Sequence, residues 1–543
     1  MKKRIALLLS LLLLLSAMAG CTPPVEQAEA SEIFNFAYLG VSSLNPAHSQ
    51  SNIETSVLGL LHAQLIRMYS GKIQLDAAES YEPNSDYTEY TFHLRKDLQW
   101  SDGEPLTAYD FEYGVYCLLA PEMGSPRGSG WYMIKNAEAF VTGALTDWSQ
   151  VGVKAIDEHT LVFTLERPLS DFDRSLAIKH IFPIRKDLVE RIGVEMLGSE
   201  PANLIYSGPY VLESREGANL VMQKNERYWN SANSFPTKTL NFIKVEDPNT
   251  QIAMFENGDV DAIECLSAQY VEYLKDNLFT ISGAGIELIW FNRNGTSEET
   301  ARILQNRNFR LALSYALNRN DVTLAANSTY LPANYIIDPG FLAPNGERFI
   351  DAYPAEAAPL EGDPAKAQEY LTAAMQELDI ADVSEFPTMK IVSFAGNDFK
   401  LECETMMNQW KQNLGLDCFI LQQFEVGVAI DTFYSTDYDL YVISWEPDVR
   451  PTDILEALSF NREGNPGVWY NEEYEALVKE AVSEVDPVRK AELTAQAQQL
   501  FLDDAGIVPV YMMCGVHAVQ SYVTGFQTGS IDGYEWDHLT VTK

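Results

Sequence analysis

A carboxylate beside an aromatic ring follows a short apolar run late in the chain. Residues 439–444 are almost continuously apolar, as expected for a strand that is covered on both faces of a sheet. Trp445, Glu446 and Asp448 come directly after Ser444. Open α/β sheets place ligands at the carboxyl ends of their strands, so Asp448 is positioned to pair with a cationic group and Trp445 offers a flat apolar surface. Alternatively, Asp448 is a loop acid or a cap, and Glu446 either adds negative potential or faces water.

Motifs for catalysis are missing from the sequence. It contains no GxSxG elbow, no P-loop and no zinc motif such as HExxH. The 77 Asp and Glu residues produce close acidic pairs by chance, so such pairs do not indicate a glycosidase. Five cysteines follow Cys21, none with CxxC or metal-ligand spacing, and Cys403 and Cys418 either pair or stay as buried thiols. We therefore predict a binding protein without a cofactor or a metal, and not an enzyme.

The first 21 residues have the layout of a secretory signal. Three bases at positions 2–4 precede an apolar stretch over residues 5–15, and small residues then lead to Cys21. A cysteine in this place resembles a bacterial lipobox, which implies cleavage before Cys21 and acylation of its thiol by fatty acids such as palmitate. A plain signal peptide with an incidental cysteine is the alternative. We predict a signal peptide over residues 1–20 and a Pro-, Glu- and Ala-rich tether over residues 21–32.

Length and charge narrow the class further. A chain of 543 residues exceeds what one hydrophobic core usually fills, so two or three domains are expected. The formal net charge of −39 disfavours nucleic acid as a partner, because phosphates need neutralisation by Lys and Arg.

A strand, a turn and a helix follow one another between Tyr90 and Val115 (YTFHLRKDLQWSDGEPLTAYDFEYGV). Residues 90–94 alternate in the manner of a strand, residues 101–105 contain the Gly and Pro of a turn, and Thr107 is a helix cap with Asp110 in the first turn. The whole string resembles the signature of the extracytoplasmic solute-binding proteins of family 5, the substrate-binding lipoproteins of oligopeptide ABC importers. The DEHTL, PANLIYSGPY and RLALSYALNRNDV segments extend the resemblance over nearly all of residues 33–543.

Alternating strands and helices in the second half predict the fold class. Helices are expected over residues 364–378, 401–414, 474–485 and 487–504, and strands over residues 389–394, 417–422, 439–444 and 508–512. Near the amino end, a strand over residues 33–39 precedes a helix over residues 52–68. Such βαβ units indicate a mostly parallel sheet covered by helices.

The resemblance implies a periplasmic-binding-protein-like fold, with two α/β lobes joined by a hinge and a smaller accessory domain. Domain I is then expected over residues 33–68, 206–288 and 512–543, domain II, the accessory domain, over residues 69–205, and domain III over residues 289–511.

The resemblance also implies site residues. Asp448 in the SWEPD run matches the aspartate that holds the amino group of a peptide, with Ser444, Trp445 and Glu446 around it. The loop after Pro46 lines the cleft in the family, which here adds Gln50 and Asn52. Family matches likewise suggest Asn292, Tyr511 and Arg127 as ligand residues. Each of these also has an ordinary reading: core or hinge positions for Asn292 and Tyr511, and an exposed loop residue for Arg127, which we favour slightly there.

The implied function is capture of oligopeptides by a monomeric lipoprotein on the extracytoplasmic face of the cell membrane, which passes them to the permease subunits and cytoplasmic ATPases of an ABC importer. Family members also take dipeptides, haem, nickel complexes or oligosaccharides, so these solutes stay open. A peptide sensor without transport and, less favoured, a secreted hydrolase are the remaining alternatives.

Overall fold

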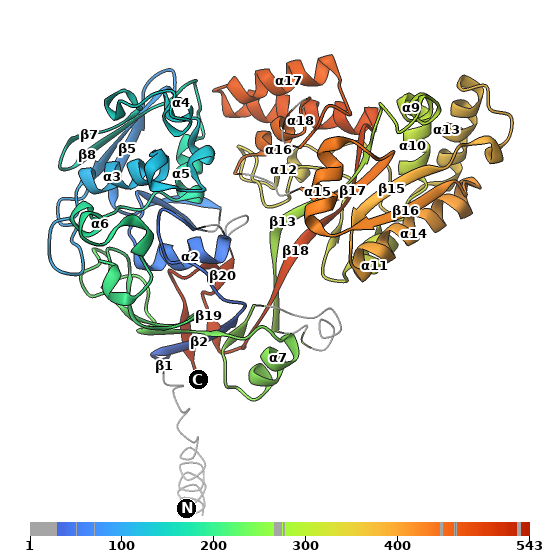
Figure 1. Cartoon of the computed structure of the whole chain (residues 1–543). Coiled ribbons are helices and arrows are strands. Elements are labelled where there is room, and N and C mark those ends of the chain that lie inside the picture. Colours follow the sequence, from blue (N-terminus) through green and yellow to red (C-terminus); the bar gives the residue numbers. More distant parts are fainter. Residues whose placement is uncertain are drawn as a thin grey trace, which may run out of the picture.

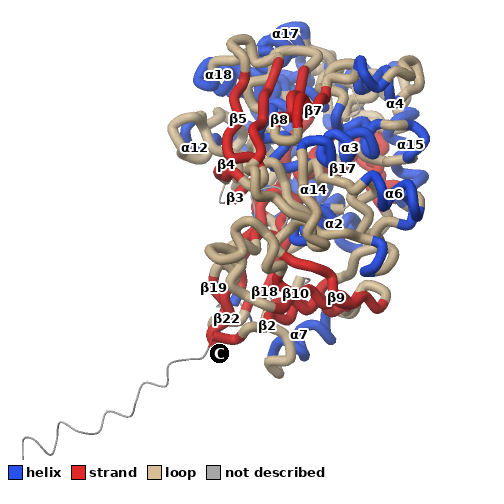
Figure 2. The backbone as a smooth tube through the Cα atoms, turned by 90° about the vertical axis from the view of Figure 1, so that its left-hand side faces the viewer, coloured by secondary structure: helices blue, strands red, loops and turns tan. Residues whose placement is uncertain are grey.

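The computed structural model describes residues 30–49, 51–69, 71–264, 274, 277–445, 449–460, 462, 464–528 and 534–543. Two lobes stand side by side and are joined at their base (Figure 1). The first lobe comprises residues 30–264 and 520–543, and the second lobe comprises residues 286–512. An accessory unit, residues 78–181, forms the upper part of the first lobe (Figures 1 and 2).

One sheet runs through both lobes. Its strands in spatial order are β16 (Phe419–Phe424), β15 (Met389–Phe394), β17 (Leu440–Trp445), β13 (Leu278–Phe291), β18 (Ile507–Val519), β12 (Ala262–Ile263), β2 (Ile33–Tyr38), β11 (Thr239–Lys244), β10 (Asn219–Lys224) and β9 (Tyr210–Glu216), and β14 (Leu331–Pro332) pairs with β18. The long strands β13 and β18 connect the lobes, because β13 pairs with β17 in the second lobe while β18 pairs with β12 in the first.

The sheet is of mixed direction, which corrects the expectation of a mostly parallel sheet. β15 pairs in parallel with β16 and β17, and β2 with β11 and β12, as the βαβ reading predicts. The pairs of β13 with β17 and β18, of β18 with β12 and β14, and of β10 with its neighbours are antiparallel. The physical reason is the crossing between lobes: β13 enters the second lobe and β18 leaves it, so these neighbours point in opposite directions.

The ladder between β13 and β18 is interrupted at its middle. The register shifts between Ile281 and Gly285, and Gly285 has φ 152°, a conformation open to glycine. In the described residues, the part of β13 before Gly285 pairs only with β18. This stretch therefore has fewer backbone constraints than the sheet on either side of it.

Helices cover both faces of the sheet in the second lobe. Leu288 and Trp290 face one core and Ile289 and Phe291 the other, the two-residue alternation of a strand buried on both sides. One face is covered by α9 (Glu298–Gln305), α10 (Arg307–Tyr315), α11 (Arg319–Ala326), α13 (Pro364–Glu377) and α14 (Asn397–Leu414). The other is covered by α12 (Phe349–Ala352), α15 (Val426–Ser435), α16 (Pro451–Ala457), α17 (Glu472–Ser483) and α18 (Pro487–Asp504). The predicted strand over residues 389–394 and helix over residues 487–504 are confirmed.

The accessory unit is built on a four-stranded antiparallel sheet. Its strands in spatial order are β5 (Ala78–Pro83), β6 (Glu89–Leu94), β8 (Thr160–Thr164) and β7 (Val153–Asp157). Its helices are α3 (Ala108–Leu119), α4 (Ala137–Val141) and α5 (Phe172–Lys179), and α6 (Lys186–Ile192) follows. The predicted strand, turn and helix are confirmed, with Gly103 at φ 94° in the turn. The Asp110 carboxylate accepts from the backbone N–H and the hydroxyl of Thr107, at 2.8 and 3.0 Å, and so ties the start of α3.

The predicted helix over residues 52–68 is too long. α2 (Asn52–Leu61) ends before His62, whose backbone is extended, and Ile66–Tyr69 forms β3, which pairs with β4 (Lys72–Leu75). Tertiary partners divert the chain here: Asp76 accepts from the backbone N–H of Gln64 at 2.9 Å and from Arg67 Nε at 2.7 Å. The apolar spacing of residues 62–68 instead serves the core of the accessory unit.

The remaining elements complete the base of the first lobe. They are β1 (Ala30–Ser31), α7 (Pro248–Glu256), β19 (Val523–Thr524), β20 (Gln527–Thr528), β21 (Tyr534–Glu535) and β22 (Thr540–Thr542). Among the described cysteines, Cys117, Cys403, Cys418 and Cys514 are free thiols. Within the described part of the chain, no helix is both long and apolar enough to cross a membrane. Cys21 lies outside the described residues.

Candidate functional site between the lobes

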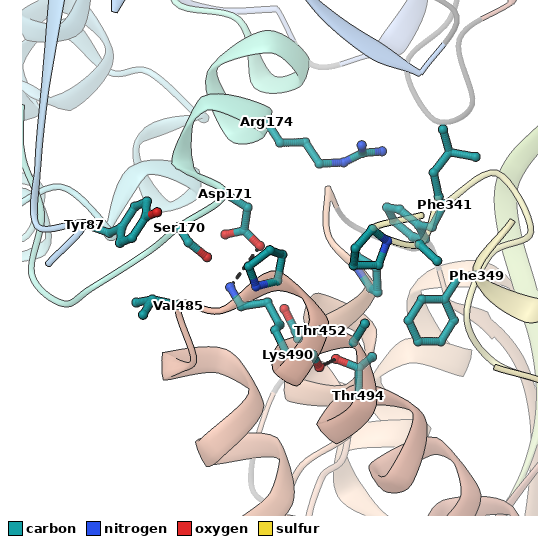
Figure 3. A pocket seen from close by; sticks show the side chains of 16 residues that line it. Tyr87, Ser170, Asp171, Arg174, Phe341, Phe349, Thr452, Val485, Lys490 and Thr494 are labelled. Atoms are coloured by element: carbon teal, nitrogen blue, oxygen red, sulfur yellow. Dashed lines mark hydrogen bonds and ion pairs between the residues drawn. The ribbon is translucent and has the colours of Figure 1, made fainter. Parts of the chain in front are cut away.

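A cavity of about 290 Å³ opens between the accessory unit and the second lobe (Figure 3). Tyr87, Ser170, Asp171 and Arg174 line it from the accessory unit, the last three from the start of α5 and the loop before it. On the opposite side it is lined by residues 341–344, by Phe349, and by residues of α16, of α18 and of the loop before α18. Both lobes therefore contribute to one hollow.

Charged side chains join the two sides of this cavity. Lys490 Nζ lies 3.2 Å from Asp171 Oδ2, and Arg450 Nη1 lies 3.7 Å from Asp171 Oδ1. Arg174 Nε donates to the Val449 carbonyl at 2.8 Å. The positive charge of Arg450 is shared, because its Nε also donates to Asp453 Oδ1 at 2.7 Å. Each charge named here has a partner of opposite sign or a carbonyl within reach.

The Arg174 guanidinium also lies 5.2 Å above the ring centroid of Phe341, so it stacks on an aromatic ring across the gap (Figure 3). Sequence reasoning missed Asp171, Arg174 and Lys490. Nothing local could have found them, since Asp171 and Lys490 are 319 positions apart.

Ser444 and Trp445 lie where the sequence predicted a ligand edge, at the end of β17. They pair with Glu287 and Ile286 of β13, and both side chains are half-buried. Trp445 packs closely on Gly464, where an added Cβ would lie 3.2 Å from its ring. The chain is described again from Val449, which touches Arg174 of the accessory unit. The two predicted carboxylates, Glu446 and Asp448, lie outside the described residues, and their ligand role stays a prediction.

Arg127 binds groups of its own lobe. Its guanidinium donates to the carbonyls of Lys179 and His180, to Ser49 Oγ at 3.2 Å and to the Pro46 carbonyl at 3.4 Å. Burial lowers the pKa of Arg127 to about 10, still well above neutrality, so it carries a charge. These contacts tie the loop before α2 to the end of α5.

Asn52 is exposed at the first turn of α2, beside that same loop. Gln50 lies outside the described residues. No described contact connects Arg127 or Asn52 with the interlobe cavity, and their ligand roles stay predictions.

Asn292 and Tyr511 are buried, with 0% and 2% of their surfaces exposed. The Asn292 amide donates to the carbonyls of Thr436 and Tyr438, at 3.0 and 2.8 Å, and so ties the end of β13 to the start of β17. A core role therefore accounts for Asn292 here. Its ligand role, like that of Tyr511, stays a prediction.

Tyr511 belongs to a buried acidic pair that sequence reasoning missed. Its hydroxyl donates to Glu402 Oε2 at 2.5 Å and lies 3.4 Å from Glu287 Oε2. Both carboxyls are buried, with 0% exposure for Glu402 and 1% for Glu287. Burial raises the pKa of Glu402 to about 8, and burial together with the neighbouring Glu402 raises the pKa of Glu287 well above its usual value. One signal was available: Glu287 interrupts the apolar run of β13.

Comparison with known proteins agrees with this architecture. The family described as bacterial extracellular solute-binding proteins, family 5 middle, matches residues 72–465. The chain is 27% identical over 485 residues to the oligopeptide-binding protein OppA of Bacillus subtilis, covering 86% of this chain and 85% of that one. It is 28% identical over 454 residues to the dipeptide-binding protein DppE of the same organism, covering 82% and 80%.

A solved structure resembles the whole arrangement. The unliganded open form of MppA, a periplasmic murein tripeptide binding protein of Escherichia coli, superimposes with a TM-score of 0.80 at 25% identity, covering 94% of this chain and 98% of that one. The two lobes and their hinge define a solute-binding protein of the two-lobe class. The chain belongs to the bacterial extracellular solute-binding proteins of family 5, a family of transport proteins.

Proposed function

We propose that this protein captures oligopeptides outside the cytoplasm and delivers them to the permease subunits of an ABC importer. The observation that carries the proposal is the family match over residues 72–465, combined with a cavity whose walls come from both lobes. The relatives with the names OppA and DppE support a peptide as the solute. Closure about β13 and β18 would bring Ser444 and Trp445 toward a ligand held by the first lobe.

Peptide recognition without regard to sequence places a definite demand on the site. The side chains vary, so the protein must hold the peptide backbone and the charged amino group. In this proposal the carboxylate of Asp448 holds the amino group, and Trp445 supplies an apolar surface next to it. The three domains expected from the sequence, with the accessory domain over residues 69–205, belong to the same proposal.

Mass spectrometry of solutes that co-purify with the protein tests the ligand class directly. Oligopeptides are expected, in about a one-to-one ratio to protein. Recovery of a bile acid, a sugar, haem or a metal chelate in their place would overturn the peptide proposal.

A secreted hydrolase is separated by a second measurement. The purified protein is incubated with a defined peptide mixture, and the mixture is followed over time. Stoichiometric retention without new fragments is expected of a receptor, whereas peptide loss exceeding the amount of protein would support the hydrolase.

We further propose that acylation of Cys21 anchors the protein to the membrane. The two or three acyl chains of a bacterial lipoprotein anchor stably, whereas a single chain binds only marginally. Cys21→Ala is therefore expected to move most of the protein from the membrane fraction to the soluble fraction. Immunoblotting of the two fractions measures this, with Cys117→Ala, a change of a buried thiol, as the matched control. Full membrane retention of Cys21→Ala would show that another feature anchors the chain.

A further inference from the structure

The interlobe cavity is walled mostly by carbon. Tyr87 lies on the accessory side, and Phe341, Leu342, Phe349 and Val485 lie on the side of the second lobe (Figure 3). Cavities of this composition at the junction of two domains are the usual place for the apolar part of a small ligand.

The charges around the cavity are already matched within the protein. Asp171 faces Lys490 at 3.2 Å and Arg450 at 3.7 Å, and Arg174 is held by the Val449 carbonyl and the ring of Phe341. A charged ligand group placed here would have to compete with these contacts and would lose hydration. An uncharged apolar group meets neither cost.

The size of the cavity suits one large side chain. Its volume of about 290 Å³ equals the space of roughly ten water molecules at ~30 Å³ each. An aromatic ring or a branched aliphatic side chain fills such a space, whereas Ala or Ser would leave most of it to water.

We propose that this cavity receives a bulky uncharged side chain of the bound peptide, such as Phe, Trp or Leu, and that it gives the protein a preference at one peptide position. This inference rests on the proposed function, because it assigns the peptide class taken by the same interlobe site. Since residues of both lobes line the cavity, a side chain seated there contacts both and favours their closed arrangement.

The test uses five peptides with free termini: tetra-alanine and its four variants with a single Phe. Calorimetry with the full-length protein gives the Kd of each. At one position Phe is expected to bind about tenfold to a hundredfold more tightly than Ala, the gain typical of burying one large apolar side chain. At that position Asp or Lys is expected to bind no better than Ala.

Two tryptophan substitutions then locate the effect. Val485 lines the cavity from the loop before α18, so Val485→Trp fills part of it. Val488 lies three residues on and is 49% exposed, so Val488→Trp is the matched control. Val485→Trp is expected to reduce the preference for Phe to about twofold or less while tetra-alanine binds as before. Val488→Trp is expected to keep the preference.

A second variant guards against misfolding. If Val485→Trp melts well below the wild type, Leu342→Trp, at a half-exposed loop position of the same cavity, takes its place. Equal affinity of all five peptides, or a Phe preference that survives both Val485→Trp and Leu342→Trp, would overturn this inference and leave the proposed function standing. If none of the five peptides binds, the proposed function itself is refuted.

Discussion

Replacing Asp448 by Asn is expected to weaken binding of a free-amine peptide by roughly 100- to 10,000-fold. The substitution keeps the shape of the side chain and removes its charge. Removing one partner of a buried charge pair typically costs ~3–5 kcal/mol, because the other charge is left uncompensated, and each ~1.4 kcal/mol is a tenfold change in Kd. Calorimetry with the wild type and Asp448→Asn measures the loss.

An N-acetylated version of the same peptide provides the control. It lacks the cationic amine, so it should bind the wild type poorly and lose little more with Asp448→Asn. A double-mutant cycle over protein and peptide gives the coupling energy between the two groups. If the two losses simply add, Asp448 does not hold the amine, and Glu446 is the next candidate.

The stability of the second lobe is expected to fall as pH rises from about 4.5 to about 8. Glu402 has its usual pKa of 4.5 in the unfolded chain and a pKa of about 8 in the folded protein. Between these values the folded state keeps a proton that the unfolded state has lost. Its stability contribution is thus complete below the unfolded pKa and disappears as pH rises through the folded one, at a slope of about 1.4 kcal/mol per pH unit for one such carboxyl.

Glu402→Gln should remove this slope for one carboxyl, because an amide does not titrate and its oxygen can still accept from Tyr511. Urea unfolding at several pH values between 5 and 8 measures it. Glu404→Gln is the matched control, since Glu404 lies two residues on in α14 with a side chain that is 47% exposed. Glu287 and Asp398 also act on Glu402, so part of the slope should remain in the variant. A slope unchanged from wild type in Glu402→Gln, as in Glu404→Gln, would contradict the assignment.

Local patterns predicted the elements, because their causes are local. The strand, turn and helix between Tyr90 and Val115 follow from alternation, from a glycine at φ 94° and from the contact of Asp110 with Thr107, all within a few residues. The helix over residues 52–68 failed because its end depends on Asp76, a partner beyond the window that shows the apolar spacing.

Strand direction and the walls of the cavity needed the tertiary structure. A buried strand has the same two-residue alternation in parallel and antiparallel sheets, so β13 and β18 could not be oriented from their residues. Asn292 and Tyr511 look like any polar residues beside a strand, and only the fold surrounds them with the Tyr438 carbonyl and the Glu402 carboxyl.

By itself the sequence determined the class of protein, the two-lobe α/β fold and the run that ends at Trp445, because these depend on periodicity and on family motifs. Only the tertiary structure decided that Arg127 ties two loops of its own lobe, and that Asp171 and Lys490 meet across the lobes. The physical reason is that an ion pair or a cavity wall depends on distances in space, and residues hundreds of positions apart leave no mark of such a contact in either local segment.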